Sequence, residues 1–156
     1  MNSYQIKAYA KINLGLDVLR RLENGYHEVK MVMQTVGIYD ELTLTRTEAG
    51  ITVTTDKEEL PTDDNNLIYK AARIMMEEYH LEGGIHIHLK KNIPIAAGMA
   101  GGSTDAAATF KGMNRLYDLD YGPINTWLLC FADRLVEIDF DWEPTAEQMA
   151  IAGAKL

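Results

Sequence analysis

The chain has 156 residues, 47% of them hydrophobic, which suits one compact domain with an ordinary buried core. Its formal net charge of −8 argues against nucleic-acid binding, because nucleic-acid-binding domains usually carry basic patches. The single cysteine, Cys130, excludes an internal disulfide bond, and no apolar run approaches the roughly 20 residues of a membrane span. We therefore expect a soluble, cytoplasmic protein with neither a nucleic-acid nor a membrane partner.

The N-terminal half predicts β-strands. Apolar and polar residues alternate over residues 12–18, which predicts a strand whose buried face includes Ile12 and Leu14. Residues 4–10 belong to the same strand or to its neighbour, and Asn24–Gly25 predicts a turn. Further strands are predicted at Val29–Ile38, Glu41–Thr47, Ile51–Thr55 and Ile85–Lys90.

Two helices are predicted beside these strands. Residues 66–80 have apolar side chains at helical spacing, and a second helix should run from Ser103 or Thr104 to about Tyr117. Strands with segregated helices indicate an α+β fold, with a mainly antiparallel sheet and the helices packed on one side. The apolar positions are Leu67, Ala71, Ile74 and Met75 in the first helix, and Phe110, Met113 and Leu116 in the second.

The last 37 residues differ in charge from the rest. Residues 120–156 hold seven acidic and two basic residues, which supply −5 of the total charge of −8. Apolar residues recur at helical spacing after Pro123, and Thr145 with Gln148 resembles a capping box. We expect residues 1–119 to form one domain and residues 120–156 to form an acidic helical tail that packs on it.

A glycine-rich loop joins the last predicted strand to the second predicted helix. Residues 94–107 read PIAAGMAGGSTDAA, with Gly98, Gly101 and Gly102 between strand and helix. Glycine lets backbone amides approach an anion, and the helix that follows points its positive dipole end at the same place. The pattern predicts a phosphate site, although a loop that merely ends a strand and caps a helix is the alternative. It matches neither the P-loop nor the dinucleotide-binding pattern.

Polar residues near this loop are further candidates. Ser103 and Thr104 could cap the helix or reach a phosphate or its Mg²⁺. Asp105 would lie in the first turn, where a carboxylate interacts favourably with the positive end of the helix dipole. His86 and His88 share the outward face of the preceding strand. That arrangement is compatible with a metal site but is more typical of a solvated strand face.

Two motifs in this order resemble the GHMP kinases, the superfamily of galactokinase, homoserine kinase and mevalonate kinase. The loop is similar to their second conserved motif. Residues 8–29, AYAKINLGLDVLRRLENGYHEV, are similar to the N-terminus of the branch that acts on 4-diphosphocytidyl-2-C-methyl-D-erythritol. The resemblance covers about residues 3–119 and implies a ribosomal-protein-S5-like α+β domain. It also implies ATP-dependent phosphorylation of a hydroxyl of that cytidine-diphosphate-linked compound in non-mevalonate isoprenoid biosynthesis.

The resemblance assigns roles to particular residues. Lys11 matches the lysine near the reacting hydroxyl, with Asn13 beside it, whereas without the resemblance Lys11 reads as a solvated strand lysine. Tyr26 and His27 match the pair that holds the cytosine ring, and we expect both near Lys11; the alternative is a turn that covers the sheet edge. ATP would bind at Asn66, near the adenine, and at Pro94, Gly98, Ala100, Gly101, Gly102, Ser103 and Thr104. Mg²⁺ is the second expected cofactor, with no protein residue assigned as its ligand.

The chain departs from the family pattern after about Asp118. A Gly-Ala-Asp-Val-Pro segment with the catalytic aspartate and a second domain should follow, and the nearest match to that segment is Ala132–Asp133. Two functions of different class stay open. One is an ATP-dependent kinase of a nucleotide-linked sugar alcohol. The other is a catalytically inactive module that binds a nucleotide or substrate, or that self-associates through an uncovered face. We expect little or no turnover from the chain as written.

Overall fold

The computed structural model of the protein describes residues 1–23 and 25–119. The predictions made for the acidic tail lie outside the described residues: its helix after Pro123, the single cysteine Cys130, and the aspartate candidate Asp133. The assignment of residues 120–156 to a packed tail therefore stays a prediction.

Four strands form one sheet in the order β1-β2-β4-β3. β2 pairs antiparallel with β4, and β3 pairs parallel with β4. β1 and β2 also run antiparallel, because the Arg46 amide donates to the Asn2 carbonyl at one end and the Leu22 amide donates to the Tyr26 carbonyl at the other. The sheet is mixed, with antiparallel pairs predominating. The strands are β1 (Ser3–Arg21), β2 (His27–Thr47), β3 (Gly50–Thr55) and β4 (Gly84–Lys90).

Period-two alternation places one face of this sheet in the core. Leu42 lies opposite Leu89, Leu44 lies opposite Ile87, and none of these four side chains is more than 1% exposed. The strands predicted at residues 51–55 and 85–90 are confirmed.

The two strands predicted at residues 29–38 and 41–47 are one continuous strand, β2, so a break between them is wrong. Asp40 lies at the expected break. Its side chain accepts the backbone N–H groups of Asn92 and Ile93 instead of forming a local turn, so β2 remains extended.

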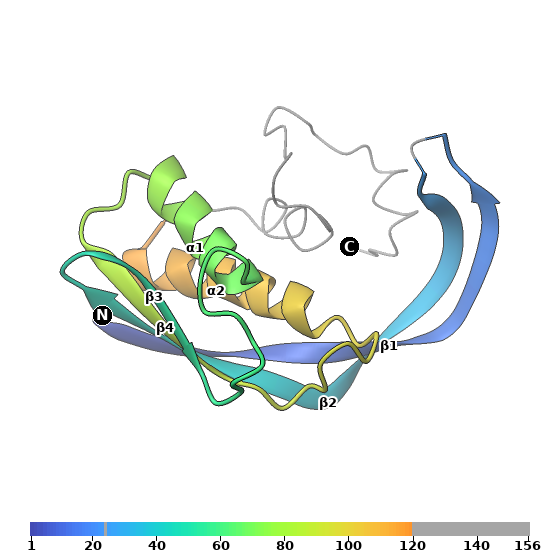
Figure 1. Ribbon diagram of the computed structural model, residues 1–156, viewed down its shortest axis with the longest axis horizontal. Helices are drawn as coiled ribbons and strands as arrows, with labels where there is room; N and C mark the ends of the chain where they lie inside the picture. The colour runs from blue at the N-terminus through green and yellow to red at the C-terminus, as the bar shows by residue number, and fades with distance from the viewer. Residues whose placement is uncertain (24, 120–156) are drawn as a thin grey trace. The chain divides into compact units, whose positions relative to one another are not determined.

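Two helices, α1 (Leu67–Glu78) and α2 (Gly101–Tyr117), pack together and cover the same face of the sheet (Figure 1). This layering confirms the predicted α+β class. Neither of these described helices is long and apolar enough to cross a membrane. The largest buried side chains of the helices are Ile68 and Met75 from α1, and Phe110, Met113 and Leu116 from α2.

The C-terminal end of α2 is tied to the sheet by polar contacts. The Arg46 guanidinium donates to the Leu116 carbonyl and lies 4.3 Å from the centre of the Tyr117 ring. The Tyr117 hydroxyl donates to the Gly84 carbonyl at 3.1 Å. A cation at a helix C-terminus is favourable, so these contacts fix the end of α2 opposite the glycine-rich loop.

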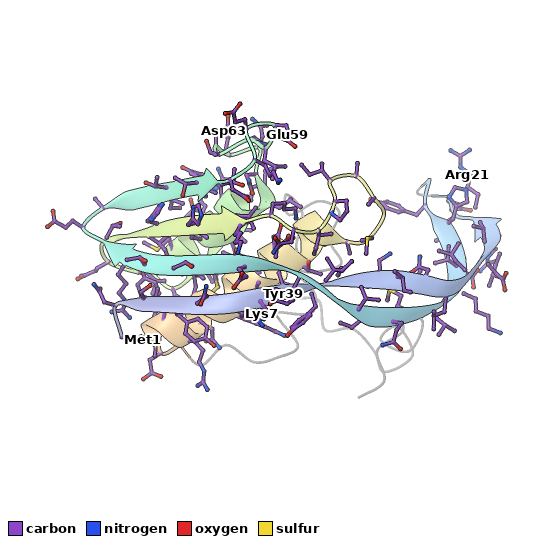
Figure 2. All side chains as sticks on the ribbon, turned by 90° about the horizontal axis from the view of Figure 1, so that it is seen from below. Met1, Lys7, Arg21, Tyr39, Glu59 and Asp63 are labelled. Carbon is purple, nitrogen blue, oxygen red and sulfur yellow. The ribbon has the colours of Figure 1, made fainter. Side chains whose placement is uncertain are left out.

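Aromatic contacts join β1 to β2 on the sheet surface. Lys7 Nζ lies 4.1 Å from the centre of the Tyr39 ring, and the Tyr9 ring meets Tyr39 edge-on with centroids 5.4 Å apart. Figure 2 shows the labelled Lys7 and Tyr39 side chains next to each other. These cation–π and edge-to-face contacts hold the two strands together at the surface of the sheet.

The described chain divides into two compact units, one of residues 1–10 and 37–119 and one of residues 11–36. The second unit is a curved hairpin made from the outer parts of β1 and β2 (Figure 1). The chain turns between β1 and β2 as predicted, because the Leu22 amide donates to the Tyr26 carbonyl at 2.7 Å and Gly25 has a φ of 86°. Asn24 itself lies outside the described residues.

The apolar residues of this hairpin are not buried. Ile12 is 36% exposed and Leu14 is 64% exposed, so the prediction that they fill the core is wrong. Alternating burial along β1 ends at Ala8 and Ala10. A period-two pattern predicts the extended backbone correctly, but it does not indicate how much of a strand is covered by other elements.

Candidate phosphate-binding site

The loop between β4 and α2 has an alternating backbone. Ala96, Gly98 and Ala100 have positive φ angles of 58°, 70° and 61°, whereas Ala97 and Met99 do not. Segments in which positive-φ residues alternate with residues of negative φ can turn successive N–H groups toward one side, as anion-binding loops do. Two alanines in a conformation that L residues rarely adopt store strain, which is typical of ligand-binding loops.

α2 begins earlier than the sequence pattern indicates. Ala100 is its N-cap, and the Thr104 amide donates to the Ala100 carbonyl at 2.9 Å, so Gly101 and Gly102 belong to the first turn. The prediction that Ser103 or Thr104 caps the helix is wrong, because the cap has no side-chain hydrogen bond and the Thr104 hydroxyl donates to the Gly101 carbonyl. The first amides of α2 therefore remain available to an anion.

A pocket of about 390 Å³ lies at this end of α2. Asn66 and Leu67 at the start of α1 line it together with Gly101–Ser103 at the start of α2. The positive ends of two helix dipoles thus meet at one pocket, which favours a negatively charged ligand. Of the predicted nucleotide-site residues, the pocket brings together Asn66, Pro94, Gly98, Ala100, Gly101, Gly102 and Ser103, whereas Thr104 is not among its lining residues.

A buried charged cluster adjoins this pocket, which two of its members, Lys91 and Asp105, line. Lys91 Nζ lies 2.6 Å from Asp40 Oδ2 and 2.6 Å from Asp105 Oδ2, and the three side chains are at most 5% exposed. A Cβ on Gly101 would lie only 2.9 Å from Lys91 Nζ, so the ammonium group sits directly against the first turn of α2. Breaking a buried pair of this kind is strongly destabilising, because it leaves an uncompensated charge.

Asp105 differs from its predicted role. The prediction placed it in the first turn facing the helix dipole, but α2 has no acidic residue in that turn, and Asp105 is buried against Lys91. Burial raises the pKa of the Asp105 carboxyl to about 7, the Lys91 ammonium opposes that rise, and Asp40 adds to it. Its second oxygen, Oδ1, has no hydrogen-bond partner.

Asn66 holds the start of α1 at the pocket wall. Its side-chain oxygen accepts the Ile68 amide at 2.8 Å, and its side-chain nitrogen donates to the Pro61 carbonyl at 2.7 Å. An asparagine N-cap satisfies one amide that the helix leaves unpaired. Asn66 therefore fixes the geometry of the pocket, besides having been predicted to lie near an adenine.

The two strand histidines face a threonine. His86 Nε2 and His88 Nδ1 lie 3.0 Å and 2.9 Å from the Thr54 hydroxyl on β3. Within residues 1–23 and 25–119, no three His, Cys, Asp or Glu side chains gather as a metal site would require. These contacts fit the solvated strand face, which was the favoured interpretation.

The predicted substrate residues all belong to the hairpin of residues 11–36. Lys11 Nζ donates to Asn13 Oδ1 at 3.3 Å, so these two side chains share a face as alternation predicts. The pairing of β1 with β2 puts His27 beside the Arg20–Arg21 end of β1, about nine residues or roughly 30 Å of strand from Lys11. The structure therefore does not bring His27 into contact with Lys11, and the substrate role of these residues stays a prediction.

Sequence reasoning missed Lys91 and Asp40. Both continue a buried alternation: Lys91 is in phase with Ile87 and Leu89, and Asp40 is in phase with Leu42. A charged residue at an inward strand position could have indicated this buried pair, because such residues are rarely buried without a partner.

Comparisons with known proteins agree with this fold. Residues 66–135 match the family of the GHMP kinases N terminal domain, and the matched region includes α1, β4, the loop and α2. This part of the chain is therefore a GHMP kinase N-terminal domain.

Within that class, the chain is homologous to 4-diphosphocytidyl-2-C-methyl-D-erythritol kinases. It is 57% identical over 121 residues to the enzyme of that name from Lachnospira eligens, and 51% identical over 120 residues to that from Acetivibrio thermocellus. Each match covers 77% of this chain and 42% of the relative. A crystal structure of 4-(cytidine 5'-diphospho)-2C-methyl-D-erythritol kinase matches with a TM-score of 0.71 and 33% identity, covering 83% of this chain and 47% of that one. The chain thus spans less than half the length of these relatives.

Proposed function

We propose that this chain provides the nucleotide-binding half of an ATP-dependent kinase that phosphorylates a hydroxyl of 4-diphosphocytidyl-2-C-methyl-D-erythritol. The observation that carries the proposal is the pocket at the N-terminus of α2, lined by Gly98 and Gly101–Ser103, in a chain homologous to kinases of that name. The product would belong to isoprenoid biosynthesis. The absence of a membrane-spanning helix among the described residues is compatible with the expected cytoplasmic location.

Positioning and electrostatics would provide most of the catalysis. The bond between the γ-phosphorus and its bridging oxygen breaks while the substrate oxygen bonds to that phosphorus, and the charge is spread over the phosphoryl oxygens. Amides of the loop and of the first turn, up to residue 103, and the helix dipole would stabilise this charge, and they need no rearrangement during the reaction. Lys91 lies beneath the first turn, but Asp40 and Asp105 share its charge, so it does not act there as an unpaired cation.

The substrate would be held by the hairpin. Tyr26 is 52% exposed and offers an aromatic face for stacking on a cytosine ring, and the imidazole of His27 can hydrogen-bond to the same ring. We assign Lys11, with Asn13 on the same strand face, to the reacting hydroxyl. These assignments rest on the resemblance of residues 8–29 to the kinase branch.

Mg²⁺ would enter together with the triphosphate. This ion is usually held by one or two protein oxygens plus phosphate oxygens, so a complete cage of protein ligands is not needed. Ser103 lines the pocket, and we assign its hydroxyl to that role. Mg²⁺ would neutralise phosphate charge there.

A second candidate is a module that binds the nucleotide without turning it over. The curated relatives extend far beyond the matched region, which covers 42% of their length, and a catalytic aspartate segment is not recognisable in this sequence. The exposed hairpin side chains Leu14, Leu16 and Val18 are compatible with self-association of such a module.

Paired binding and turnover measurements separate these candidates. Calorimetry with Mg-ATP should detect saturable binding, and a coupled assay with 4-diphosphocytidyl-2-C-methyl-D-erythritol should detect ADP release only if the chain is catalytically complete. We expect binding without substantial turnover, with turnover restored by extending the chain with a relative's C-terminal part. Lys11→Ala in the extended enzyme should lower kcat at least about 10²-fold if Lys11 serves the hydroxyl. Failure to bind ATP would contradict both candidates.

A further inference from the structure

One oxygen atom at the pocket lacks a partner. Asp105 Oδ1 is buried and is the single side-chain atom of the described residues 1–23 and 25–119 that is both buried and unpaired. Asp105 also lines the pocket, together with Lys91. A buried polar atom without a hydrogen bond is unfavourable unless a proton or a ligand completes it.

The charges around this atom oppose the binding of an anion. Asp40 and Asp105 share one ammonium group, that of Lys91, so the cluster carries a net charge of −1 when all three groups are ionised. This negative charge lies under Gly101, at the end of α2 where phosphate would bind. Protonation of one carboxyl would make the cluster neutral.

Geometry selects Asp105 as the carboxyl that takes the proton. Asp40 Oδ1 already accepts two N–H groups, from Asn92 at 2.6 Å and from Ile93 at 2.8 Å. Asp105 Oδ1 accepts none. A proton on this oxygen would also convert an unpaired acceptor into a donor at the pocket.

We propose that Asp105 is a proton-linked positioning residue: it takes up one proton from solvent when a phosphate group binds, and its Oδ1–H then donates to that group. The inference rests on the proposed triphosphate site and adds a residue that makes anion affinity depend on pH. No covalent bond to the ligand forms. Burial raises the pKa of Asp105 to about 7, so the proton is available near neutral pH.

Few charged groups face Asp105 from the elements packed around it. Lys91 from the segment after β4 and Asp40 from β2 are the charged groups that face it. α1 presents the uncharged Asn66 and Leu67 to the same pocket, and the loop of residues 94–100 has no titratable side chain.

Sulfate is a suitable probe, because it keeps two negative charges across the neutral pH range and does not titrate itself. Its affinity is measured from the amide chemical shifts of Gly101–Thr104 during sulfate titrations of the full chain at pH 6.0 and pH 8.5. A site that requires one proton near pH 7 loses up to about tenfold in affinity per pH unit above that value, so we expect at least about fivefold weaker binding at pH 8.5. Asp105→Asn should bind with less than about twofold change over this range.

Asp118→Asn is the matched control, because Asp118 lies at the opposite end of α2 and its left-handed backbone tolerates asparagine. It should retain the pH dependence of the unsubstituted chain.

The carbon-13 shift of the Asp105 carboxyl in the unsubstituted chain reports the same proton without any substitution, and sulfate should move its titration to higher pH. Equal affinities at both pH values, or an unchanged pH dependence in Asp105→Asn, would overturn the inference while leaving the phosphate site intact. If the amides of Gly101–Thr104 do not respond to sulfate, the proposed site itself is wrong.

Discussion

Gly112 of α2 packs directly on Leu44 of β2. A Cβ at position 112 would lie 2.8 Å from Leu44 Cδ1 and 2.9 Å from Leu44 Cδ2, and Leu44 is fully buried. The helix approaches the sheet this closely because position 112 has no side chain. This contact sets the distance between helix and sheet in the middle of α2, and the pocket lies at the N-terminal end of the same helix.

Gly112→Val should therefore destabilise the protein. Overpacking a close-packed core typically costs about 1–3 kcal/mol, and valine does not offset this through helix propensity as alanine would in part. Urea denaturation of the variant measures the loss. Lys111→Val places the same side chain at the neighbouring exposed position and should change the free energy of unfolding by less than about 1 kcal/mol. Equal stabilities of the two variants would show that Gly112 is not required for the close packing.

Asn66 at the pocket wall should contribute to stability as the N-cap of α1. Asn66→Ala removes the N-cap of α1 and leaves the Pro61 carbonyl without its donor, so a loss of about 1–3 kcal/mol in the free energy of unfolding is expected. Asn66→Ser keeps a side-chain oxygen of the kind that caps helices and puts no second acceptor against the Pro61 carbonyl, so it should lose less. Thermal denaturation of the two variants at neutral pH compares them. An alanine variant as stable as the unsubstituted chain would contradict the capping role.

Much of this architecture follows from sequence patterns. The inward positions of β4, the two helices and the turn before Gly25 were predictable, because they depend on periodicity and local turn chemistry. The exposure of Ile12 and Leu14 was not, because alternation does not report which part of a long strand is covered. Burial of a strand is decided by elements distant in the sequence.

The candidate site was predictable only in part. Glycine content drew attention to the loop, but Ala96 and Ala100 adopt left-handed conformations that no alanine propensity predicts. The pairing of Asp40 with Lys91 joins residues 51 positions apart, so only the fold reveals it. Tertiary contacts impose both features on residues whose local preferences indicate otherwise.

Alanine substitutions at the two neighbouring glycines in the first turn of α2 should differ in their effect on stability. Gly101→Ala would push a methyl group within 2.9 Å of Lys91 Nζ and 3.2 Å of Ile93 Cγ2, and two carboxylates hold that ammonium in place. We expect a loss of about 1–2 kcal/mol in the free energy of unfolding. Gly102→Ala meets only the end of the Leu67 side chain at 3.3 Å and should change stability by less than about 0.5 kcal/mol. Scanning calorimetry distinguishes them, and the reverse order would contradict the position of Lys91.

Asp105 makes stability depend on pH in a defined direction. Because burial raises its pKa from 3.8 to about 7, the folded protein holds a proton between these values that the unfolded chain releases. This carboxyl therefore lowers the free energy of unfolding as pH rises through that window, and its effect is constant at higher pH. Asp105→Asn removes the titration. The free energy of unfolding of the unsubstituted chain minus that of the variant should fall across the window, and a flat difference would contradict a raised pKa.

The central claim is that the loop of residues 96–100 and the first turn of α2 bind the triphosphate of ATP. The most direct measurement is a map of backbone amide shifts during titration with Mg-ATP, with AMP as the ligand that lacks the β- and γ-phosphates. We predict saturable shifts that are largest at residues 96–104, and much weaker effects of AMP on Gly101–Thr104. Saturable ATP binding that shifts amides elsewhere and leaves residues 96–104 unchanged would contradict the account.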